Sequence, residues 1–502
     1  MILSRREAMV GGLGSMLIPS ALAAQNASLP APRPADPLAA LETVVQDEMR
    51  ASGTPGAALA IIAGDRIFAT GFGVASVEAG GSVDGDTLFR IASTTKMLTG
   101  AAVAVSAVRG LVDLHAPVGR YVPDLPAGIG GATLDQLLSH RAGLRDETVY
   151  HGLHDDAELG RFIASWRGDI QIAPTDDVYS YSNLGYGLAG HALERRTGRP
   201  FADAVRAAVF EPLGMARSTF RPTEAMTFPL SQGHEPAPAG PVVVRPFADN
   251  VRYWPNGGAF TSAREFARFA VALLNGGMVD GRQALPPAAV ALMLGSHAEV
   301  PGAPAGLPSH YGYGLNVRSI GGRRMLQHGG ERIGFGSLFR IIPERRVGVV
   351  LLANRTGASL VGSLEAATEV ALAMQAGGGP PPAPAVAQVE GGRGRLAEAP
   401  LLESLLGRYV NAPGELELEL LMQGGRVMMR GNGESGPVPV DRLPDGRYSA
   451  GGQAFSFIRG RRTGRYYLFV AGRALRRVSP DASPARRATR PRSAAGRRPP
   501  PR

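Results

Sequence analysis

Apolar residues recur at helical spacing soon after a Pro- and Ala-rich segment near the start of the chain. From Leu38 onward, one face would carry Leu41, Val44, Val45 and Met49. Apolar positions three and four residues apart lie on the same side of a helix. This stretch therefore predicts an amphipathic helix that packs through that face.

Two pairs of apolar runs, far apart in the chain, have the composition of β-strands. The first pair lies in AALAIIAGDRIFATGFGVAS around a turn at residues 63–65, and the second, GSLFRII and VGVVLLA, flanks the turn at residues 343–346. The segments between the pairs are mostly helical or loop-like. The pattern predicts an α+β domain over residues 38–375, in which an antiparallel sheet is built from both ends and flanked by helices, beside an all-helical region.

A second, smaller β-domain is predicted over residues 401–478. The stretch GELELELLMQGGRVMMRG alternates with period two across Gly424-Gly425, and further short strands follow. Residues 376–400 have the Pro- and Gly-rich composition of a linker. We expect a small all-β, barrel-like domain after this linker.

The net charge of +10 is concentrated at the C-terminus. Residues 479–502 hold seven arginines and one aspartate, with many prolines and no aromatic residue. Such a composition is typical of a disordered, solvated tail. We therefore expect no nucleic-acid partner.

The first residues resemble an export signal. Two arginines, Arg5 and Arg6, precede an apolar stretch that ends at the small-x-small pattern Ala21-Leu22-Ala23, which predicts a signal peptide at residues 1–23 and a linker at 24–37. The paired arginines suggest the twin-arginine route. The chain has no cysteine, hence neither disulfides nor a lipid-modified cysteine. We expect a periplasmic or secreted protein without stable membrane insertion.

Lys96 is the only lysine in a chain that carries 52 arginines. Where charge alone is needed, this composition uses arginine. Unlike a guanidinium, a desolvated ammonium can lose its proton. The isolated lysine therefore indicates proton transfer.

Ser93 precedes Lys96 by three residues and opens a segment with helical character, MLTGAAVAVSAVRGLV. Residues three apart lie on one face of a helix, so the two side chains would be neighbours. The positive end of the helix dipole favours an alkoxide at its N-terminus. The pair is a candidate nucleophile and base.

Two further motifs carry candidate groups. In YSYSN, Tyr181 offers a phenol that could relay a proton and Asn183 an amide that could orient Lys96 or a substrate carbonyl; Tyr179 is the competing phenol. In QHGGERIGFGS, His328 ends a predicted strand, and the following glycines would let a substrate approach backbone N–H groups that hold an oxyanion. The cluster HGLHDD at residues 151–156 is better explained as solvated loop than as metal ligands, so neither a metal nor a cofactor is expected.

Taken in order, these motifs resemble the serine β-lactamase and penicillin-binding family, in its class C, DD-peptidase and esterase-like branch. The stretches that carry the resemblance are LFRIASTTKMLTG, GLVDLHAPVGRYVPDLP, ATLDQLLSHRAGL, YSYSNLGYGLAG, PNGGAFTSAREFARF and IIPERRVGVVLLANRTG. It extends over about residues 38–375. The later β-domain is similar to the lipocalin-like extension of some exported members.

The resemblance implies a role for each motif residue. Ser93 would be the acylated nucleophile, Lys96 its proton acceptor, and Tyr181 and Asn183 the relay and positioning groups. The third motif would supply substrate contacts and part of the oxyanion hole, whose backbone N–H groups belong to Ser93 and Glu331. The implied substrate-binding residues are His328, Gly329 and Gly330.

This third motif departs from the one typical of β-lactamases, Lys-Thr-Gly or Lys-Ser-Gly, in which the cation and the hydroxyl bind the β-lactam carboxylate. Here His328 is mostly neutral at pH 7 unless its pKa is raised, and Gly329 has no hydroxyl. Recognition of a carboxylate through this motif is therefore not expected.

The sequence thus predicts an exported serine hydrolase that acts through an acyl-enzyme on Ser93. Its substrate would be a small-molecule ester, or an amide such as a cell-wall D-amino-acid peptide, so it would be an esterase or a DD-carboxypeptidase-like D-amino-acid peptidase or amidase. The alternatives are a β-lactamase proper and a catalytically silent module that binds peptidoglycan. A silent module would have little use for a single lysine at this spacing.

Overall fold

The computed structural model of the protein describes residues 37–303, 309–320, 323–375, 401–412, 416–431 and 436–478. The expected signal peptide (1–23), all but the last residue of the 24–37 linker, the 376–400 linker and the basic tail (479–502) lie outside the described residues.

A nine-stranded antiparallel sheet forms the centre of the larger domain, with the strand order β10-β11-β12-β13-β14-β15-β1-β2-β3. The two strand pairs expected from the sequence meet inside it, because β1 pairs with β15 and Ala57 lies opposite Ala353. The strands are β1 (Gly56–Ala63), β2 (Arg66–Ser76), β3 (Gly80–Ser82), β10 (Ala298–Val300), β11 (Ser309–Tyr311), β12 (Asn316–Ile320), β13 (Arg323–Arg332), β14 (Phe335–Ile342) and β15 (Val347–Ala353).

Every residue of β1 is buried because both faces of the sheet are covered. Ala58, Ala60 and Ile62 pack into the core shared with the helical region. The alternate residues Ala57, Leu59 and Ile61 pack into a second core on the opposite face. Alternation along one strand therefore supplies two separate cores.

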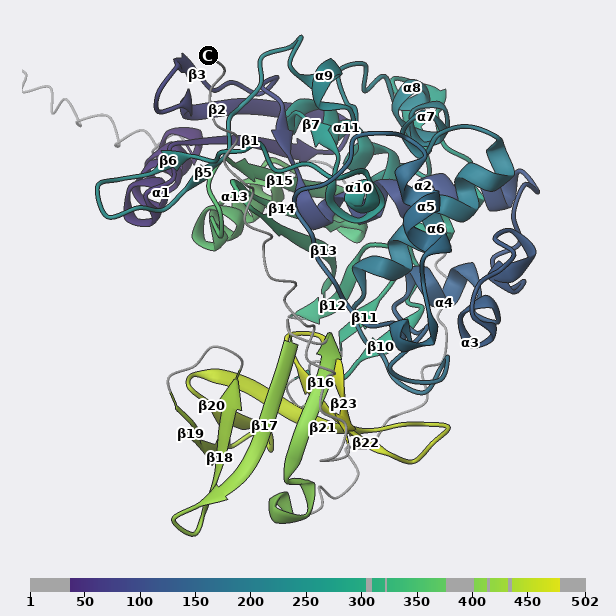
Figure 1. Ribbon diagram of the computed structural model, residues 1–502. Helices are drawn as coiled ribbons and strands as arrows, with labels where there is room; N and C mark the ends of the chain where they lie inside the picture. The colour runs from purple at the N-terminus through teal and green to yellow at the C-terminus, as the bar shows by residue number, and fades with distance from the viewer. Residues whose placement is uncertain are drawn as a thin grey trace, which may run out of the picture.

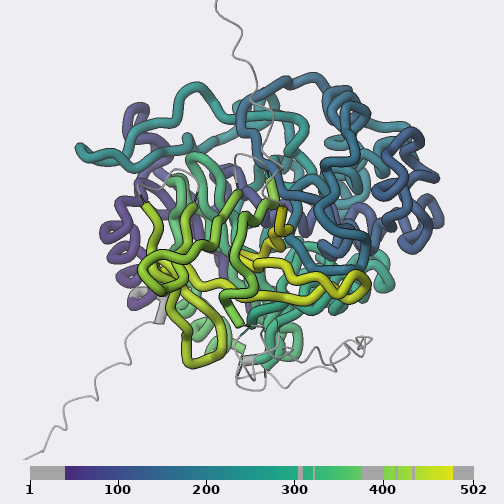
Figure 2. Tube along the Cα trace, turned by 60° about the horizontal axis from the view of Figure 1, so that its bottom comes forward, coloured from purple at the N-terminus to yellow at the C-terminus, as the bar shows by residue number. Residues whose placement is uncertain are grey.

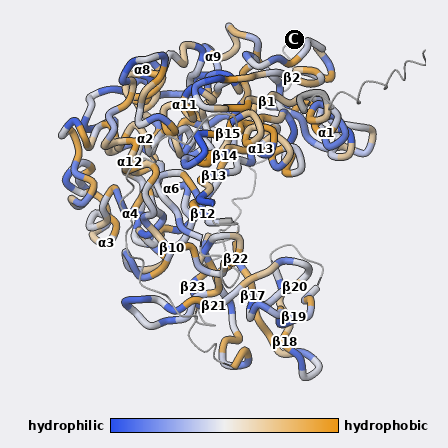
Figure 3. Tube along the Cα trace, turned by 180° about the vertical axis from the view of Figure 1, so that it is seen from behind, coloured by the Kyte–Doolittle hydropathy of each residue, from blue (hydrophilic) through white to orange (hydrophobic). Residues whose placement is uncertain are grey.

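Helices α1 (Pro37–Ser52) and α13 (Val361–Gln375) cover one face of the sheet, and α11 (Ala263–Leu274) covers the other. In Figure 3, apolar stretches follow α11 and α13. The predicted apolar face of α1 is right for Leu41, Val45 and Met49, which are buried. It is wrong for Val44, which is 38% exposed because it lies on the solvent side of that contact.

The remaining helices form the expected all-helical region beside the sheet (Figure 1). No helix that the structure describes is both long enough and apolar enough to cross a bilayer. The helices are α2 (Thr95–Val108), α3 (Ala127–Gly130), α4 (Leu134–Leu138), α5 (Glu158–Ala164), α6 (Asn183–Thr197), α7 (Phe201–Val205), α8 (Glu211–Leu213), α9 (Pro222–Ala225), α10 (Trp254–Gly257) and α12 (Pro287–Leu294). Short strand pairs join their loops: β4 (Phe89–Arg90) with β7 (Phe260–Thr261), β5 (His234–Glu235) with β6 (Val242–Val243), and β8 (Met278–Val279) with β9 (Arg282–Gln283).

The C-terminal strands close into an eight-stranded antiparallel barrel, in which β16 pairs with both β17 and β23. Its interior is filled by apolar side chains such as Tyr409, Leu420 and Leu468. The predicted α+β domain followed by a small β-barrel is thus confirmed. The barrel strands are β16 (Gly407–Ala412), β17 (Leu416–Gln423), β18 (Arg426–Gly431), β19 (Val438–Arg442), β20 (Tyr448–Ala450), β21 (Gln453–Arg459), β22 (Tyr466–Val470) and β23 (Arg473–Val478).

The barrel packs against the larger domain through an apolar cluster to which both domains contribute side chains. It lies beside the β10–β12 end of the sheet (Figure 1), and Figure 2 shows its yellow end crossing to the helical region. The cluster joins barrel residues Tyr467, Phe469 and Ala474 to residues of the larger domain that include Tyr179 and Tyr311. Apolar burial therefore holds the two domains together.

Asp177 anchors this contact with a buried carboxylate. Its oxygens accept hydrogen bonds from the backbone N–H groups of Arg462 (2.7 Å) and Thr463 (2.8 Å), and from the hydroxyls of Thr463 (2.8 Å) and Tyr467 (2.8 Å). All four donors belong to the barrel. One carboxylate of the larger domain thus accepts hydrogen bonds from donors in and next to the hairpin loop between β21 and β22.

Asp177→Ala should destabilise the contact between the domains by about 2–4 kcal/mol, because it leaves buried donors without an acceptor. Chemical denaturation would show the loss, and limited proteolysis would cut the barrel faster. Asp441→Ala is the matched control, since Asp441 is an exposed partner of Arg426 on the barrel surface. Equal stability of the two variants would contradict the anchoring role.

Candidate active site

Ser93 lies in a short 3₁₀ turn, η1 (Ala92–Thr94), directly before α2. The chain enters this turn from β4 through Ala92, whose φ of +48° is unusual for a residue with a Cβ. Such backbone strain is typical of functional turns. The turn leaves Ser93 partly exposed while its neighbours are buried.

The amine of Lys96 is fully buried beneath Ser93. Its Nζ lies 3.2 Å from Ser93 Oγ, 2.7 Å from Asn183 Oδ1 and 3.0 Å from the backbone oxygen of Asn256. The last two atoms can only accept hydrogen bonds. A neutral amine has two N–H groups for these acceptors, and its lone pair is then left for the Ser93 hydroxyl.

Burial lowers the pKa of Lys96 to about 7. The Asp146 carboxylate opposes this shift, and the Arg473 guanidinium adds to it. Desolvation disfavours the charged amine, and no carboxylate of the described residues contacts it directly. A base with a pKa near neutrality suits proton abstraction from a serine hydroxyl.

Tyr181 brings the second motif to the same place. Its ring centroid lies 4.8 Å from Lys96 Nζ. Burial raises the pKa of the phenol, and its interaction with the Ser93 hydroxyl opposes the shift. The competing phenol, Tyr179, instead packs in the contact with the barrel, against Phe469. Asn183 begins α6, directly after its N-cap Ser182.

His328 of the third motif is buried and both ring nitrogens have partners. Nε2 lies 3.0 Å from the Tyr311 hydroxyl and Nδ1 lies 2.6 Å from the Gly329 oxygen. Burial and the nearby Lys96 lower the pKa of His328 to about 3. The imidazole is therefore neutral at physiological pH, and it cannot replace the cation of a Lys-Thr-Gly motif.

Gly330 lets β13 approach the nucleophile closely. A Cβ at this position would lie 3.0 Å from the backbone nitrogen of Ser93 and 2.5 Å from the Ile91 oxygen. Any larger residue would push the strand away from η1. Glycine thus lets the strand approach η1 closely, while the oxyanion-hole role of the Ser93 and Glu331 N–H groups stays a prediction.

These residues line one cavity of about 530 Å³. It has the size of a small-molecule site. Residues from every motif contribute to its wall: Ser93, Tyr181, Asn183, His328, Gly329, Gly330 and Glu331. The HGLHDD segment contacts other groups, since His154 Nδ1 lies 2.8 Å from Asp249 and Asp156 pairs with Arg221.

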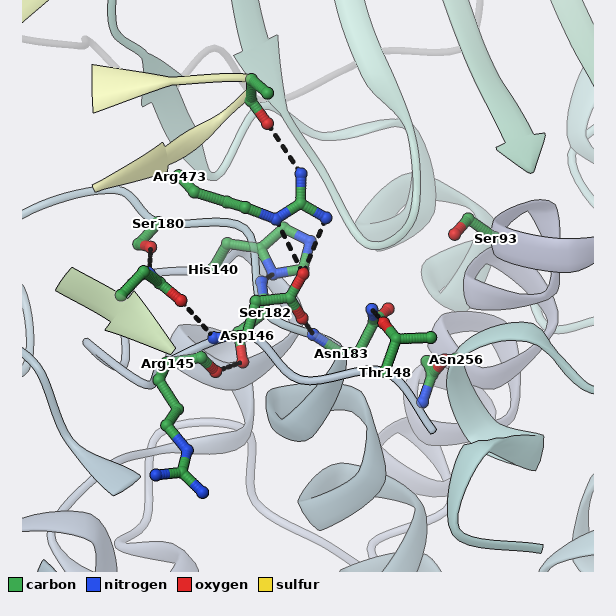
Figure 4. Close-up of polar contacts among 12 residues, drawn as sticks. Ser93, His140, Arg145, Asp146, Thr148, Ser180, Ser182, Asn183, Asn256 and Arg473 are labelled. Atoms are coloured by element: carbon green, nitrogen blue, oxygen red, sulfur yellow. Dashed lines mark hydrogen bonds and ion pairs between the residues drawn. The ribbon is translucent and has the colours of Figure 1, made fainter. Parts of the chain in front are cut away.

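A set of groups that carries no sequence motif supports the motif residues. Asp146 accepts a hydrogen bond from the Asn183 N–H at 2.7 Å, and its own N–H donates to Asn411 Oδ1 of the barrel at 2.7 Å. Arg473, also from the barrel, pairs with Asp146 (Figure 4). No motif marks these positions, because they meet only when the barrel packs against the larger domain.

Residues 41–372 match the family model described as Beta-lactamase, and the chain therefore belongs to this family of serine hydrolases. Penicillin-binding protein 4 of Amycolatopsis lactamdurans is 30% identical over 314 residues, which cover 60% of this chain and 81% of that protein. The Unguisins hydrolase ungD' of Aspergillus campestris is 28% identical over 330 residues. That match covers 61% of this chain and 59% of the fungal protein.

The similarity to a solved structure extends beyond the family domain. The crystal structure of SurE superposes with a TM-score of 0.69 and 25% sequence identity, over 88% of this chain and 99% of that chain. A match over 88% of this chain extends beyond residues 41–372, which the family model covers.

The pH dependence of activity should follow Lys96. If the neutral amine is the base, kcat/KM should fall about tenfold per pH unit below pH 7 and reach a plateau above it. A neutral p-nitrophenyl ester, which has no titrating group of its own in this range, gives the profile. A plateau that extends unchanged down to pH 5 would exclude Lys96 as the base.

Lys96→Arg should lose about 3–5 kcal/mol of transition-state stabilisation, because a guanidinium keeps the charge but cannot take the proton. The measurement is kcat/KM on the best ester, with a thermal melt to show that the fold survives. Retention of more than about a tenth of the activity would correspond to a loss below about 1.4 kcal/mol. The lysine would then act through its charge.

Proposed function

We propose that this protein is an exported serine hydrolase that forms an acyl-enzyme on Ser93 and acts as an esterase or as a D-amino-acid peptidase or amidase. The observation that carries the proposal is the buried amine of Lys96. It lies 3.2 Å from Ser93 Oγ and has two acceptor-only oxygens for the N–H groups of its neutral form, which would leave the lone pair of that form for the Ser93 hydroxyl.

In the proposed reaction, Ser93 Oγ attacks the acyl carbon of the substrate while its proton passes to Lys96 Nζ. The carbonyl π electrons move to the oxygen, which the backbone N–H groups of Ser93 and Glu331 would hold. When the intermediate collapses, the bond to the leaving group breaks and that group takes a proton through Tyr181. Water then attacks the acyl-enzyme in the same way and releases the acid.

The neutral third motif favours this function over efficient β-lactam hydrolysis. The His328 ring has both nitrogens engaged and a pKa lowered to about 3, and Gly329 adds no hydroxyl. A β-lactam carboxylate would find neither of its usual partners at that motif. Esters and simple amides do not depend on them.

A catalytically silent peptidoglycan-binding module is a poorer explanation of the same site. Burying an amine without a contacting carboxylate costs free energy, and a binding protein gains nothing from it. An enzyme uses the resulting low pKa for proton transfer. The arrangement around Lys96 therefore supports catalysis.

A fluorescent phosphonate should label the protein, and Ser93→Ala should abolish both labelling and turnover. Ser404→Ala, on the exposed edge of the barrel, is the control and should change neither. Mass spectrometry should locate the adduct on Ser93; an adduct on another serine would disprove the assignment of the nucleophile.

The substrate class is tested by parallel screening of p-nitrophenyl esters, D-amino-acid amides and nitrocefin, with a fluorescent penicillin as a second label. We expect turnover of esters or amides above that of nitrocefin. Labelling by neither probe, together with no turnover, would favour the silent module.

A further inference from the structure

The active-site cavity lacks the cation that the third motif usually provides, yet it contains two arginines. Arg332 and Arg473 both contribute to its lining. Only a guanidinium with free N–H groups on the cavity side can bind a substrate anion. The two side chains differ in this respect.

Arg332 is held inside the cavity wall. It is 4% exposed, and its terminal nitrogens donate to the backbone oxygens of Ala248 at 2.8 Å and Gly257 at 3.3 Å. These contacts use only two of its five N–H groups, but the side chain is buried, so little of the guanidinium is exposed to a ligand in the cavity. Its hydrogen bonds tie β13 to the segments that contain Ala248 and Gly257, which is a structural role.

Arg473 belongs to the barrel and reaches the cavity from the tip of a hairpin. The two-residue turn Ala471-Gly472 joins β22 to β23, and both turn residues have positive φ, as a tight hairpin turn requires. Tyr181 N–H donates to the Gly472 oxygen at 2.9 Å, which fixes the tip beside the second motif. Ala471 itself lines the cavity.

The guanidinium of Arg473 keeps donors for a ligand. Nε and Nη2 contact Asp146 Oδ2 at 2.7 Å, and Nη1 donates to the Ala471 oxygen at 2.8 Å. These contacts with described residues use three of its five N–H groups. The side chain is 27% exposed and Arg473 lines the cavity, which leaves the remaining two for a ligand there.

Its position beside Tyr181 indicates which part of the substrate it meets. The guanidinium carbon lies 5.0 Å from the centroid of the Tyr181 ring. A group that protonates the leaving group must lie next to it. Arg473 lines the same cavity as Ser93 and Tyr181, so it would lie on the side of the cavity where Tyr181 meets the leaving group.

We infer that Arg473 binds a carboxylate on the leaving group of the substrate, so that the barrel supplies the anion-binding cation that the third motif of the larger domain lacks. The inference rests on the proposed hydrolase function and narrows its substrate class. Preferred substrates are esters or amides whose leaving group ends in a free carboxylate. Fork-shaped pairing of a guanidinium with a carboxylate provides both charge and geometry.

The test compares two esters with the same acyl group: hippuryl-D-phenyllactate, whose leaving group carries a carboxylate, and its neutral methyl amide. Assays at pH 9 keep Lys96 neutral in every variant. We expect the wild type to prefer the acid at least tenfold. Arg473→Gln should lower the ratio of kcat/KM for the acid to kcat/KM for the neutral ester by about 10- to 100-fold, mostly through the KM of the acid.

Two further variants separate binding from folding. Arg473→Lys retains the charge and the pairing with Asp146 and should keep part of the preference, while Arg476→Gln, on the exposed side of β23, should behave as wild type. A pH profile gives an independent readout. Because Arg473 lowers the pKa of Lys96, the acidic limb should move to higher pH in Arg473→Gln and stay in place in Arg473→Lys.

Equal losses on both esters in Arg473→Gln, or a wild type without preference for the acid, would overturn the inference and leave the hydrolase proposal standing. A wild type that turns over neither ester and takes up no phosphonate would instead overturn the proposed function, and the inference with it.

Discussion

The site depends on one constraint: the amine of Lys96 is buried, and within the part of the chain that the structure describes no carboxylate contacts it. A charged ammonium in that position would be costly, so the surroundings favour the neutral form. They do so with two acceptor-only oxygens, one from Asn183 at the start of α6 and one from the backbone of α10. Lys96 belongs to α2, so the packing of the helical region has to bring three helices, α2, α6 and α10, together at one nitrogen atom.

The barrel is part of this environment. Asp146 links the two domains, since it accepts from the Asn183 N–H on one side and pairs with Arg473 on the other. Its negative charge and the positive charge of Arg473 act on the Lys96 pKa in opposite directions. The position of the β22–β23 hairpin tip determines how close Arg473 lies to Lys96. The position of the barrel therefore affects the pKa of Lys96.

Local patterns predicted the groups that lie close together in sequence or in one regular element. The spacing of Ser93 and Lys96, the alternation along β1 and the turn between β14 and β15 each have a local physical cause, and the single lysine of the chain is the residue whose amine lies beside Ser93. Arg473 had no such mark, since it is one arginine among many and its role arises from a contact between domains. Val44 shows the same limit on a smaller scale, because periodicity gives the apolar face of a helix but not the width of its contact.

The pairing of β1 with β15 has a kinetic consequence. Ala57 and Ala353 are neighbours in space, yet nearly the whole larger domain separates them along the chain. Closing so long a loop costs chain entropy that local helical contacts do not incur, and chains dominated by such pairings fold slowly. The helical region can gain structure while the chain is still being synthesised. The central strands have no complete set of partners until β15 emerges, so the interval before that moment is when their apolar edges are most open to aggregation.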